Sequence, residues 1–142
     1  MIKKVRHGCF ETNSSIEHAL IVLLEEDNEK WKNDDHLYVY TSENPEYNSV
    51  FKKLSAEERP VYMKLYTEEE VFAFIEKGSG RTKEEILDDI DEEYDDVADM
   101  LYIEYDFITS EMWFNGEFYY DTYEYTAPSG ERLKIHARYR ED

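Results

Sequence analysis

Residues 118–139, FYYDTYEYTAPSGERLKIHARY, contain two alternating runs of residues on either side of a four-residue turn. The turn, Ala127-Pro128-Ser129-Gly130, has proline at its second and glycine at its fourth position, which is typical of a type I β-turn. The sequence therefore predicts a hairpin that joins Phe118–Thr126 with Glu131–Tyr139 and closes the fold.

The pairing register decides which side chains share a face of this hairpin. We expect Thr126 to face Glu131. One face then carries Phe118, Tyr120 and Thr122 with Leu133, Ile135, Ala137 and Tyr139, and we expect it to meet the core. The other face carries Tyr119, Tyr123 and Tyr125 against Arg138, Lys134 and Arg132. A cation–π lattice is the favoured interpretation of this second face, and a site for a planar ligand is the alternative.

Upstream of the hairpin, the apolar patterns predict strands at Ile16–Leu24, His36–Thr41 and Leu101–Ile108 and a short helix at Glu25–Lys32. The segment Asn44–Met63 shows no clear pattern.

Two capping boxes predict the two main helices. Thr67 with Glu70 opens a helix that ends at Gly78, and the box at residues 82–85 opens the longest helix, which runs to about Met100. Together these elements predict an α+β fold, in which two main helices cover an antiparallel sheet with a C-terminal hairpin. We expect residues 1–142 to form a single domain, because no repeat or linker composition divides them.

Composition restricts the classes of function. The 142 residues contain one cysteine, 22 aromatic residues and no apolar run long enough to span a bilayer. The start of the chain lacks the apolar segment of a signal peptide, so we expect a cytoplasmic protein. The formal charge of −19 predicts that bare nucleic acid and anionic membranes are repelled and that cationic partners are attracted.

The negative charge is concentrated in one segment, because Glu84–Glu131 holds 17 acidic residues and no lysine or arginine. On a helical wheel that starts at Ile86, apolar residues fill one face and all ten acids of 84–99 lie on the other. Ten charges over roughly 24 Å approach the charge density of duplex DNA, about one per 1.7 Å. The predicted partner-binding residues on this acidic helix are Asp88, Asp89, Glu92, Glu93, Asp95, Asp96 and Asp99.

A solvated helix face is the alternative interpretation of this segment. Like charges four residues apart, such as Asp88 with Glu92, each cost about 0.2–0.5 kcal/mol, and no lysine is placed to offset them. A function that requires an anionic surface would explain why these acidic residues are present in spite of their mutual repulsion.

Other clusters give weaker indications of chemistry. Cys9 or Ser14 would supply a nucleophile and His18 a base for catalysis. No recognised motif orients these side chains, so a catalytic site is not favoured. The favoured interpretation of Asn13–Ser15 is a turn that is held by side-chain hydrogen bonds. The four histidines are scattered, and Asp89–Glu93 lacks the glycine of a calcium loop. The sequence therefore predicts no catalytic residues, no metal site and no cofactor.

The opening run Arg6-His7-Gly8-Cys9-Phe10-Glu11-Thr12-Asn13-Ser14-Ser15, followed by His18, resembles a family of small proteins of phages and other mobile elements. Glu29–Asn33 and Thr126–Glu131 resemble later parts of that family, and the chain departs from it at Ile16, where a third serine would stand. The resemblance implies a phage or mobile-element context, and it assigns no residue a role.

These observations predict a phage-type inhibitor or adaptor that is not an enzyme. It would present its acidic helix, as a mimic of nucleic acid, to a basic host protein such as a CRISPR effector or restriction nuclease. The alternatives are a small enzyme that modifies a host protein through Cys9, Ser14 and His18, and a phage structural protein.

Overall fold

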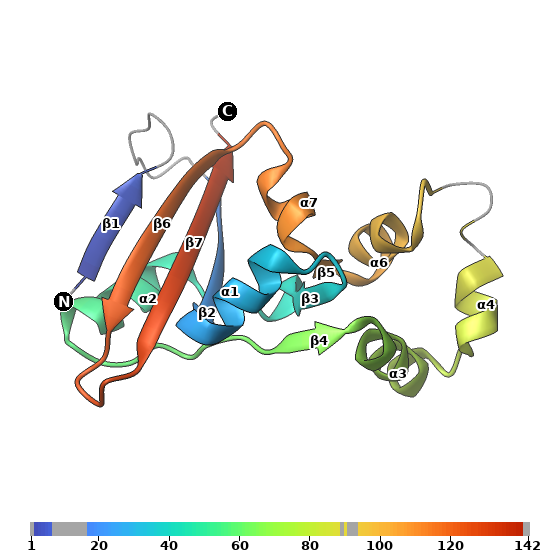
Figure 1. Cartoon of the computed structure of the whole chain (residues 1–142), viewed down its shortest axis with the longest axis horizontal. Coiled ribbons are helices and arrows are strands. Elements are labelled where there is room, and N and C mark those ends of the chain that lie inside the picture. Colours follow the sequence, from blue (N-terminus) through green and yellow to red (C-terminus); the bar gives the residue numbers. More distant parts are fainter. Residues whose placement is uncertain (1, 7–16, 89, 91–93, 141–142) are drawn as a thin grey trace.

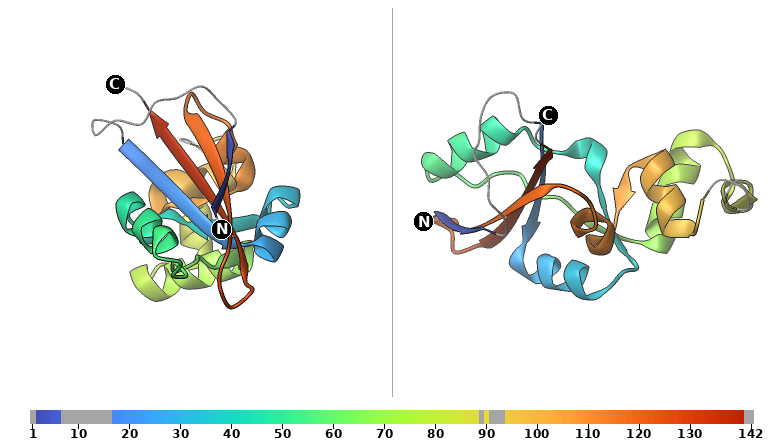
Figure 2. Two further views of the ribbon diagram at one scale, coloured as in Figure 1. Left: turned by 90° about the vertical axis from the view of Figure 1, so that its left-hand side faces the viewer. Right: turned by 90° about the horizontal axis from the view of Figure 1, so that it is seen from above.

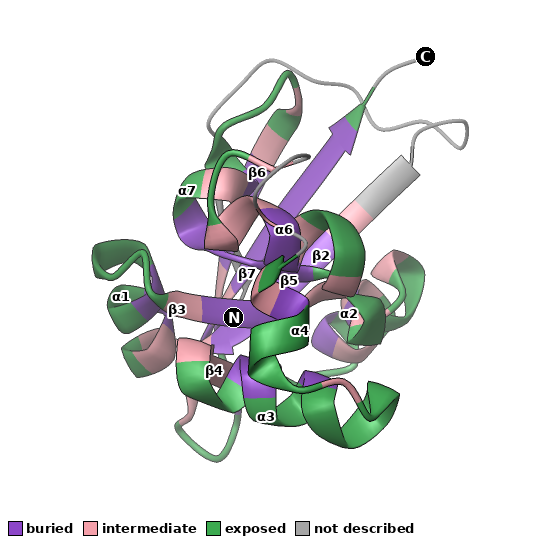
Figure 3. Cartoon of the chain, turned by 90° about the vertical axis from the view of Figure 1, so that its right-hand side faces the viewer, coloured by how far each residue is buried: buried purple, intermediate pink, exposed green. Residues whose placement is uncertain are grey.

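A computed structural model describes residues 2–6, 17–88, 90 and 94–140 of the chain. Its larger sheet has four antiparallel strands in the order β1-β6-β7-β2. Their bounds are Ile2–Arg6 for β1, Glu17–Leu24 for β2, Tyr119–Thr126 for β6 and Arg132–Arg140 for β7. The hairpin β6–β7 forms the middle of this sheet, and β7 is buried along most of its length (Figure 3).

Both faces of the four-stranded sheet are covered, as the views from the front and from above show (Figures 1 and 2). Helix α2 (Tyr47–Ser55) packs on one face, where Leu20 and Val22 of β2 point. Helices α1 (Glu25–Asn33) and α7 (Ser110–Phe114) lie on the other face, with Ile21 and Leu23. The unbroken apolar run of β2 follows from this arrangement, because a strand buried on both faces has no polar side.

A second, three-stranded sheet has the order β4-β3-β5 and consists of Leu65–Thr67, Leu37–Tyr40 and Phe107–Ile108. The 3-10 helix η1 (Thr41–Glu43) follows β3. Helices α3 (Glu68–Ser79), α4 (Lys83–Asp88) and α6 (Val97–Tyr105) pack around a core cluster that includes Tyr38 and Phe107 of this sheet. This part of the molecule lies at the end remote from β1 (Figure 1).

The predicted α+β class, the antiparallel sheet and the C-terminal hairpin are confirmed. The strands predicted near residues 16–24 and 36–41 and the helix at 25–32 are present within one or two residues. Helix α2 lies in the segment where the sequence showed no pattern. Its buried residues Val50 and Leu54 have the i, i+4 spacing that indicates such a helix.

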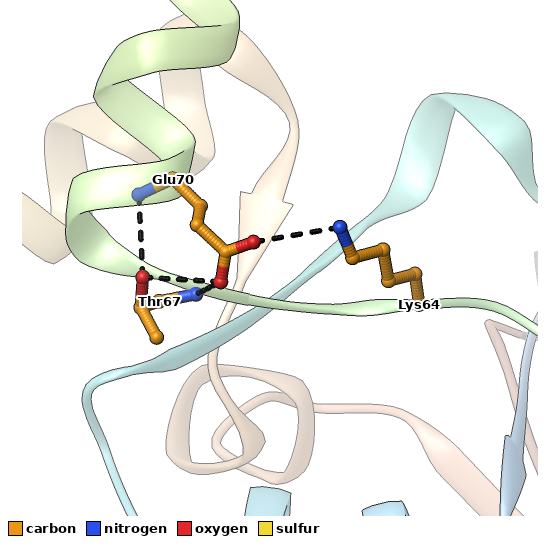
Figure 4. A network of polar contacts seen from close by, with 3 residues as sticks. All are labelled: Lys64, Thr67 and Glu70. Carbon is orange, nitrogen blue, oxygen red and sulfur yellow. Dashed lines mark hydrogen bonds and ion pairs between the residues drawn. The ribbon is translucent and has the colours of Figure 1, made fainter.

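Both capping boxes are present. At the start of α3, the Glu70 N–H donates to the Thr67 hydroxyl at 3.2 Å, and the Thr67 N–H donates back to the Glu70 carboxylate at 3.1 Å (Figure 4). The same two bonds join Thr82 and Glu85 at 3.3 and 3.2 Å. The predicted end of α3 at Gly78 is wrong by two residues, because Gly80 adopts the left-handed conformation that ends the helix.

The predicted register of the hairpin is wrong by one residue, since Thr126 pairs with Arg132 and not with Glu131. The turn does form, with the Gly130 N–H donating to the Ala127 carbonyl at 2.8 Å. Gly130 then has φ +93°, and the Ala127 N–H donates to the Glu131 carbonyl. This is a type I turn followed by a left-handed glycine, which adds one residue to the connection.

The shift by one residue exchanges the faces of β6, because side chains alternate along a strand. Tyr123 and Tyr125 are buried in the core with Leu133, Ile135 and Ala137. The predicted lattice of Tyr119, Tyr123 and Tyr125 with the three cations is therefore wrong. Cation–π contacts occur at other aromatic rings: the Arg138 guanidinium lies 4.2 Å from the ring centre of Trp113 and 4.5 Å from that of Phe118.

We expect Gly130→Ala to destabilise the protein by about 1 kcal/mol, because only glycine takes φ +93° without strain. Gly78→Ala is the control, since Gly78 lies within α3 with open space around it and alanine favours a helix by about 1 kcal/mol. Urea unfolding of the two variants should therefore show shifts of opposite sign. Equal shifts would contradict the assigned turn.

The continuous acidic helix predicted up to Met100 is wrong. Helix α4 is separated from α6 by residues 94–96, which are not helical, and Asp96 is extended at φ −156°. The Asp96 carboxylate accepts a hydrogen bond from the Asp99 N–H at 2.8 Å and thereby caps a new helix. The apolar spacing continues through the break because Leu87, Tyr94 and Val97 all pack against the same core cluster.

The strand predicted at Leu101–Ile108 is also wrong over most of its length. Residues up to Tyr105 continue α6, and Asp106, at φ 62°, ends that helix before the short strand β5. Ile103, one of the alternating apolar residues of this segment, is 57% exposed. The alternation was fortuitous, since the buried residues of α6 are the neighbours Met100 and Leu101.

Candidate functional site

The candidate site is a pocket with a volume of about 480 Å³ beside the three-stranded sheet. The first residues of α3, α6 and α7, the turn before β3 and the β3 residue Tyr38 line it. Pockets for small ligands or side chains commonly have volumes of roughly 300–1,000 Å³. This pocket is therefore large enough to receive a group from a partner molecule.

Carboxylates dominate the lining of the pocket. Six acidic residues take part: Asp35, Glu68, Asp95, Asp96, Asp99 and Glu111. The lining includes His36 but neither lysine nor arginine. None of the six carboxylates forms an ion pair with the residues that the structure describes. The described ion pairs lie elsewhere, for example between Arg59 and Glu131 at 2.8 Å.

The pocket contains only part of the predicted binding surface. Asp95, Asp96 and Asp99 line it, whereas Asp88 is exposed at the end of α4 and does not. Asp89, Glu92 and Glu93 lie outside the described residues. Sequence reasoning missed the other three acids of the pocket. Glu68 and Glu111 were recognisable as first-turn acids of helices, but only tertiary packing brings them together with Asp35.

Helix starts give part of the reason for this concentration of acids. Asp96 caps α6, and Thr109 caps α7 by accepting from the Met112 N–H at 3.3 Å. Acids in a first turn are stabilised by the positive end of the helix dipole, which amounts to roughly half a charge per helix. Three helix starts thus supply about 1.5 positive charges against six carboxylates. Helix capping alone leaves most of the negative charge unbalanced.

Tyr38 reaches this pocket from β3 and is only 1% exposed. Its hydroxyl forms no hydrogen bond with any part of the chain that the structure describes. Burial, together with the negative charges of Glu68 and Asp96, raises the pKa of Tyr38 to about 12. The hydroxyl therefore keeps its proton at neutral pH, and its oxygen can accept a hydrogen bond from a cation.

The raised pKa of Tyr38 predicts a loss of stability in alkali. A phenol with a folded-state pKa of about 12 and an unfolded value near 10 stays protonated longer in the folded protein. Its contribution to stability is complete below pH 10 and is lost as the pH rises through about 12.

The measurement is urea unfolding between pH 9 and pH 12 for the native protein and for Tyr38→Phe. The variant should lose less stability over that range. Burial also raises the pKa of Tyr123, so part of the loss should remain in the variant. Identical pH profiles for the two proteins would contradict the assigned environment of Tyr38.

The alternative chemistries involve Cys9, Ser14, His18 and potential metal ligands. Cys9 and Ser14 lie outside the described residues, and the backbone of His18 lies in β2 opposite Tyr139. No group of three or more potential ligands converges on a metal position within the described ranges. Among the helices described, none has the length and apolar character needed to cross a membrane.

Comparisons with known proteins give no match, whether with protein-family models, with curated proteins or with solved structures.

Proposed function

We propose that this protein is a phage-type inhibitor or adaptor that acts by binding a basic, nucleic-acid-processing protein of the host, such as a CRISPR effector or restriction nuclease. The acidic surface around the pocket, formed by Asp35, Glu68, residues 95–99 and Glu111, mimics the charge of nucleic acid. The observation that carries this proposal is the group of six carboxylates around one pocket, without an ion pair in the described part of the chain.

Electrostatics favours a cationic protein as the partner. With a formal charge of −19, the molecule repels nucleic acids and anionic lipids at long range and attracts basic proteins. A groove that binds phosphates is lined with lysine and arginine and would be attracted to closely spaced carboxylates. Charge complementarity of this kind raises association rates and selects against acidic partners.

The break between α4 and α6 changes the shape of the proposed surface. The acids no longer form one straight row that resembles a DNA strand, and those of α6 instead surround a concavity with acids from three other segments. The mimicry we propose is therefore one of charge and of local contact with basic side chains. The opening motif at 6–15 adds the phage context, since it resembles a mobile-element family.

The experiment is capture of partners from a host lysate on the immobilised protein, followed by binding measurements with the purified partner. We expect a nucleic-acid-binding protein that is retained at about 0.1 M salt and released at about 0.5 M, where exposed charges are screened. Short duplex DNA should compete with the protein for the same partner. If binding of the purified partner were insensitive to salt and to DNA, the proposal would be wrong.

Two further outcomes of this experiment would also contradict the proposal. A stable oligomer without a bound partner, measured by light scattering, would indicate a structural protein. Chemical modification of a captured host protein that depends on Cys9 or His18 would indicate an enzyme.

A further inference from the structure

The pocket contains a polar group that the acidic surface alone does not explain. The Tyr38 hydroxyl is carried by a side chain that is 1% exposed, and it lines the pocket without a hydrogen-bond partner in the described chain. The Tyr38 hydroxyl oxygen is not among the fully enclosed polar atoms of the described residues, so it stays accessible from the pocket. A ligand that enters the pocket can therefore donate a hydrogen bond to it.

We propose that this pocket binds an arginine side chain of the partner protein, with the carboxylates around the guanidinium and the Tyr38 hydroxyl as an additional acceptor at its base. The inference rests on the proposed function, because it names the chemical group of the basic partner that enters the site. The inference goes beyond the proposed function because it identifies arginine as the side chain of the partner that this pocket binds.

The spread of the acceptors favours an extended organic cation over a metal ion. Six carboxylates come from four separate segments, and within the described residues they do not converge on one metal position. A divalent cation needs several oxygens within about 2.6 Å of a single point. A guanidinium instead offers five N–H donors that point outward in a plane and can reach acceptors on different sides.

Arginine matches the pocket better than lysine for two reasons. Val97, Ala98 and Met112 contribute apolar residues to the lining, which suit the aliphatic part of a long side chain. The guanidinium is also less strongly hydrated than an ammonium group, so entering a partly buried site costs it less. The apolar lining residues and the dispersed acceptors together favour an arginine side chain.

The test is a titration of the ¹⁵N-labelled protein with acetyl-arginine-methylamide at low salt, followed by NMR. We expect saturable shifts at the amide of Glu68 and at amides of the segments 35–38, 95–99 and 109–115, which contribute residues to the pocket. The matching lysine compound should bind roughly threefold more weakly, and the uncharged citrulline compound should not saturate. Shifts that spread over all acidic segments without saturation would overturn the proposal.

Tyr38→Phe distinguishes a defined site from general attraction by charge, because it removes one oxygen and leaves the net charge unchanged. We expect it to weaken arginine binding roughly tenfold to a hundredfold, the usual loss for a hydrogen bond to a charged group. Its melting temperature should not fall, since the hydroxyl has no partner in the described chain. Tyr66→Phe, in β4 and outside the pocket, is the matched control and should bind as the native protein does.

Three results would each overturn the proposal: equal affinity of the Tyr38→Phe and native proteins, tighter binding of spermidine at the same amides, and tighter binding of Ca²⁺ there. The two proposals fail separately. If salt-sensitive binding of the partner persists while arginine does not saturate the pocket, only the arginine site is wrong. If arginine saturates the pocket but no basic protein binds, the proposed function is wrong.

Discussion

The variant Asp35→Lys, Asp95→Lys, Glu111→Lys loses at least about a hundredfold in affinity for the basic partner, which corresponds to about 2.8 kcal/mol. All three residues are exposed acids of the pocket, and their side chains hold no hydrogen bond or ion pair with the described residues. Folding should therefore be preserved. Reversing each charge replaces attraction with repulsion, which costs several kcal/mol across an interface. Asp96 is left unchanged because it caps α6.

The matched control reverses Glu26, Glu46 and Glu58, three exposed acids outside the pocket. Both triple variants move the formal charge from −19 to −13, since each exchange adds two charges. Calorimetry with the purified partner should show a much smaller loss for the control. Equal losses would mean that only the overall charge matters, and unchanged binding of both variants would contradict the proposed function.

The second large effect concerns Trp31, which is fully buried in α1 and joins the two sheets. Its indole N–H donates to the Ile108 carbonyl of β5 at 3.3 Å, and its ring packs against Phe114 and His136. We expect Trp31→Ala to destabilise the protein by about 3–5 kcal/mol, because it leaves a large cavity at this junction. That is a large part of a typical domain stability of about 5–15 kcal/mol.

Urea unfolding, followed by the fluorescence of Trp113, measures this loss. Trp31→Phe keeps most of the buried ring but removes the indole donor, so it should cost clearly less than alanine. A loss below about 1 kcal/mol for Trp31→Ala would show that α1 does not join the two sheets through this side chain.

The sequence predicted those elements that local interactions determine. The capping boxes at Thr67 and Thr82 depend on groups three residues apart, so their residue types are sufficient to predict them. The same holds for the turn at residues 127–130 and for the α+β class, which follows from strand and helix patterns. Similarly, charge composition alone indicates a surface that attracts cationic groups.

The predictions were wrong where the backbone conformation of one residue changed the arrangement of a whole strand or helix. The left-handed conformation of Gly130 adds one residue to the hairpin connection and thereby exchanges the two faces of β6. At Asp96, the carboxylate caps a new helix, while the apolar spacing on both sides of the break still suits one continuous helix. Periodicity does not distinguish the broken helix from a continuous one, because both place Leu87, Tyr94 and Val97 against the core.

The sequence by itself determined how much negative charge this protein carries and within which segment most of it lies, because charge is a property of residue type. The tertiary structure alone decided that Asp95, Asp96 and Asp99 share a pocket with Asp35, Glu68 and Glu111. It also decided that the buried Tyr38 contributes its hydroxyl to that pocket. The physical reason is that packing of the helices against the three-stranded sheet brings together helix starts that are far apart in the chain.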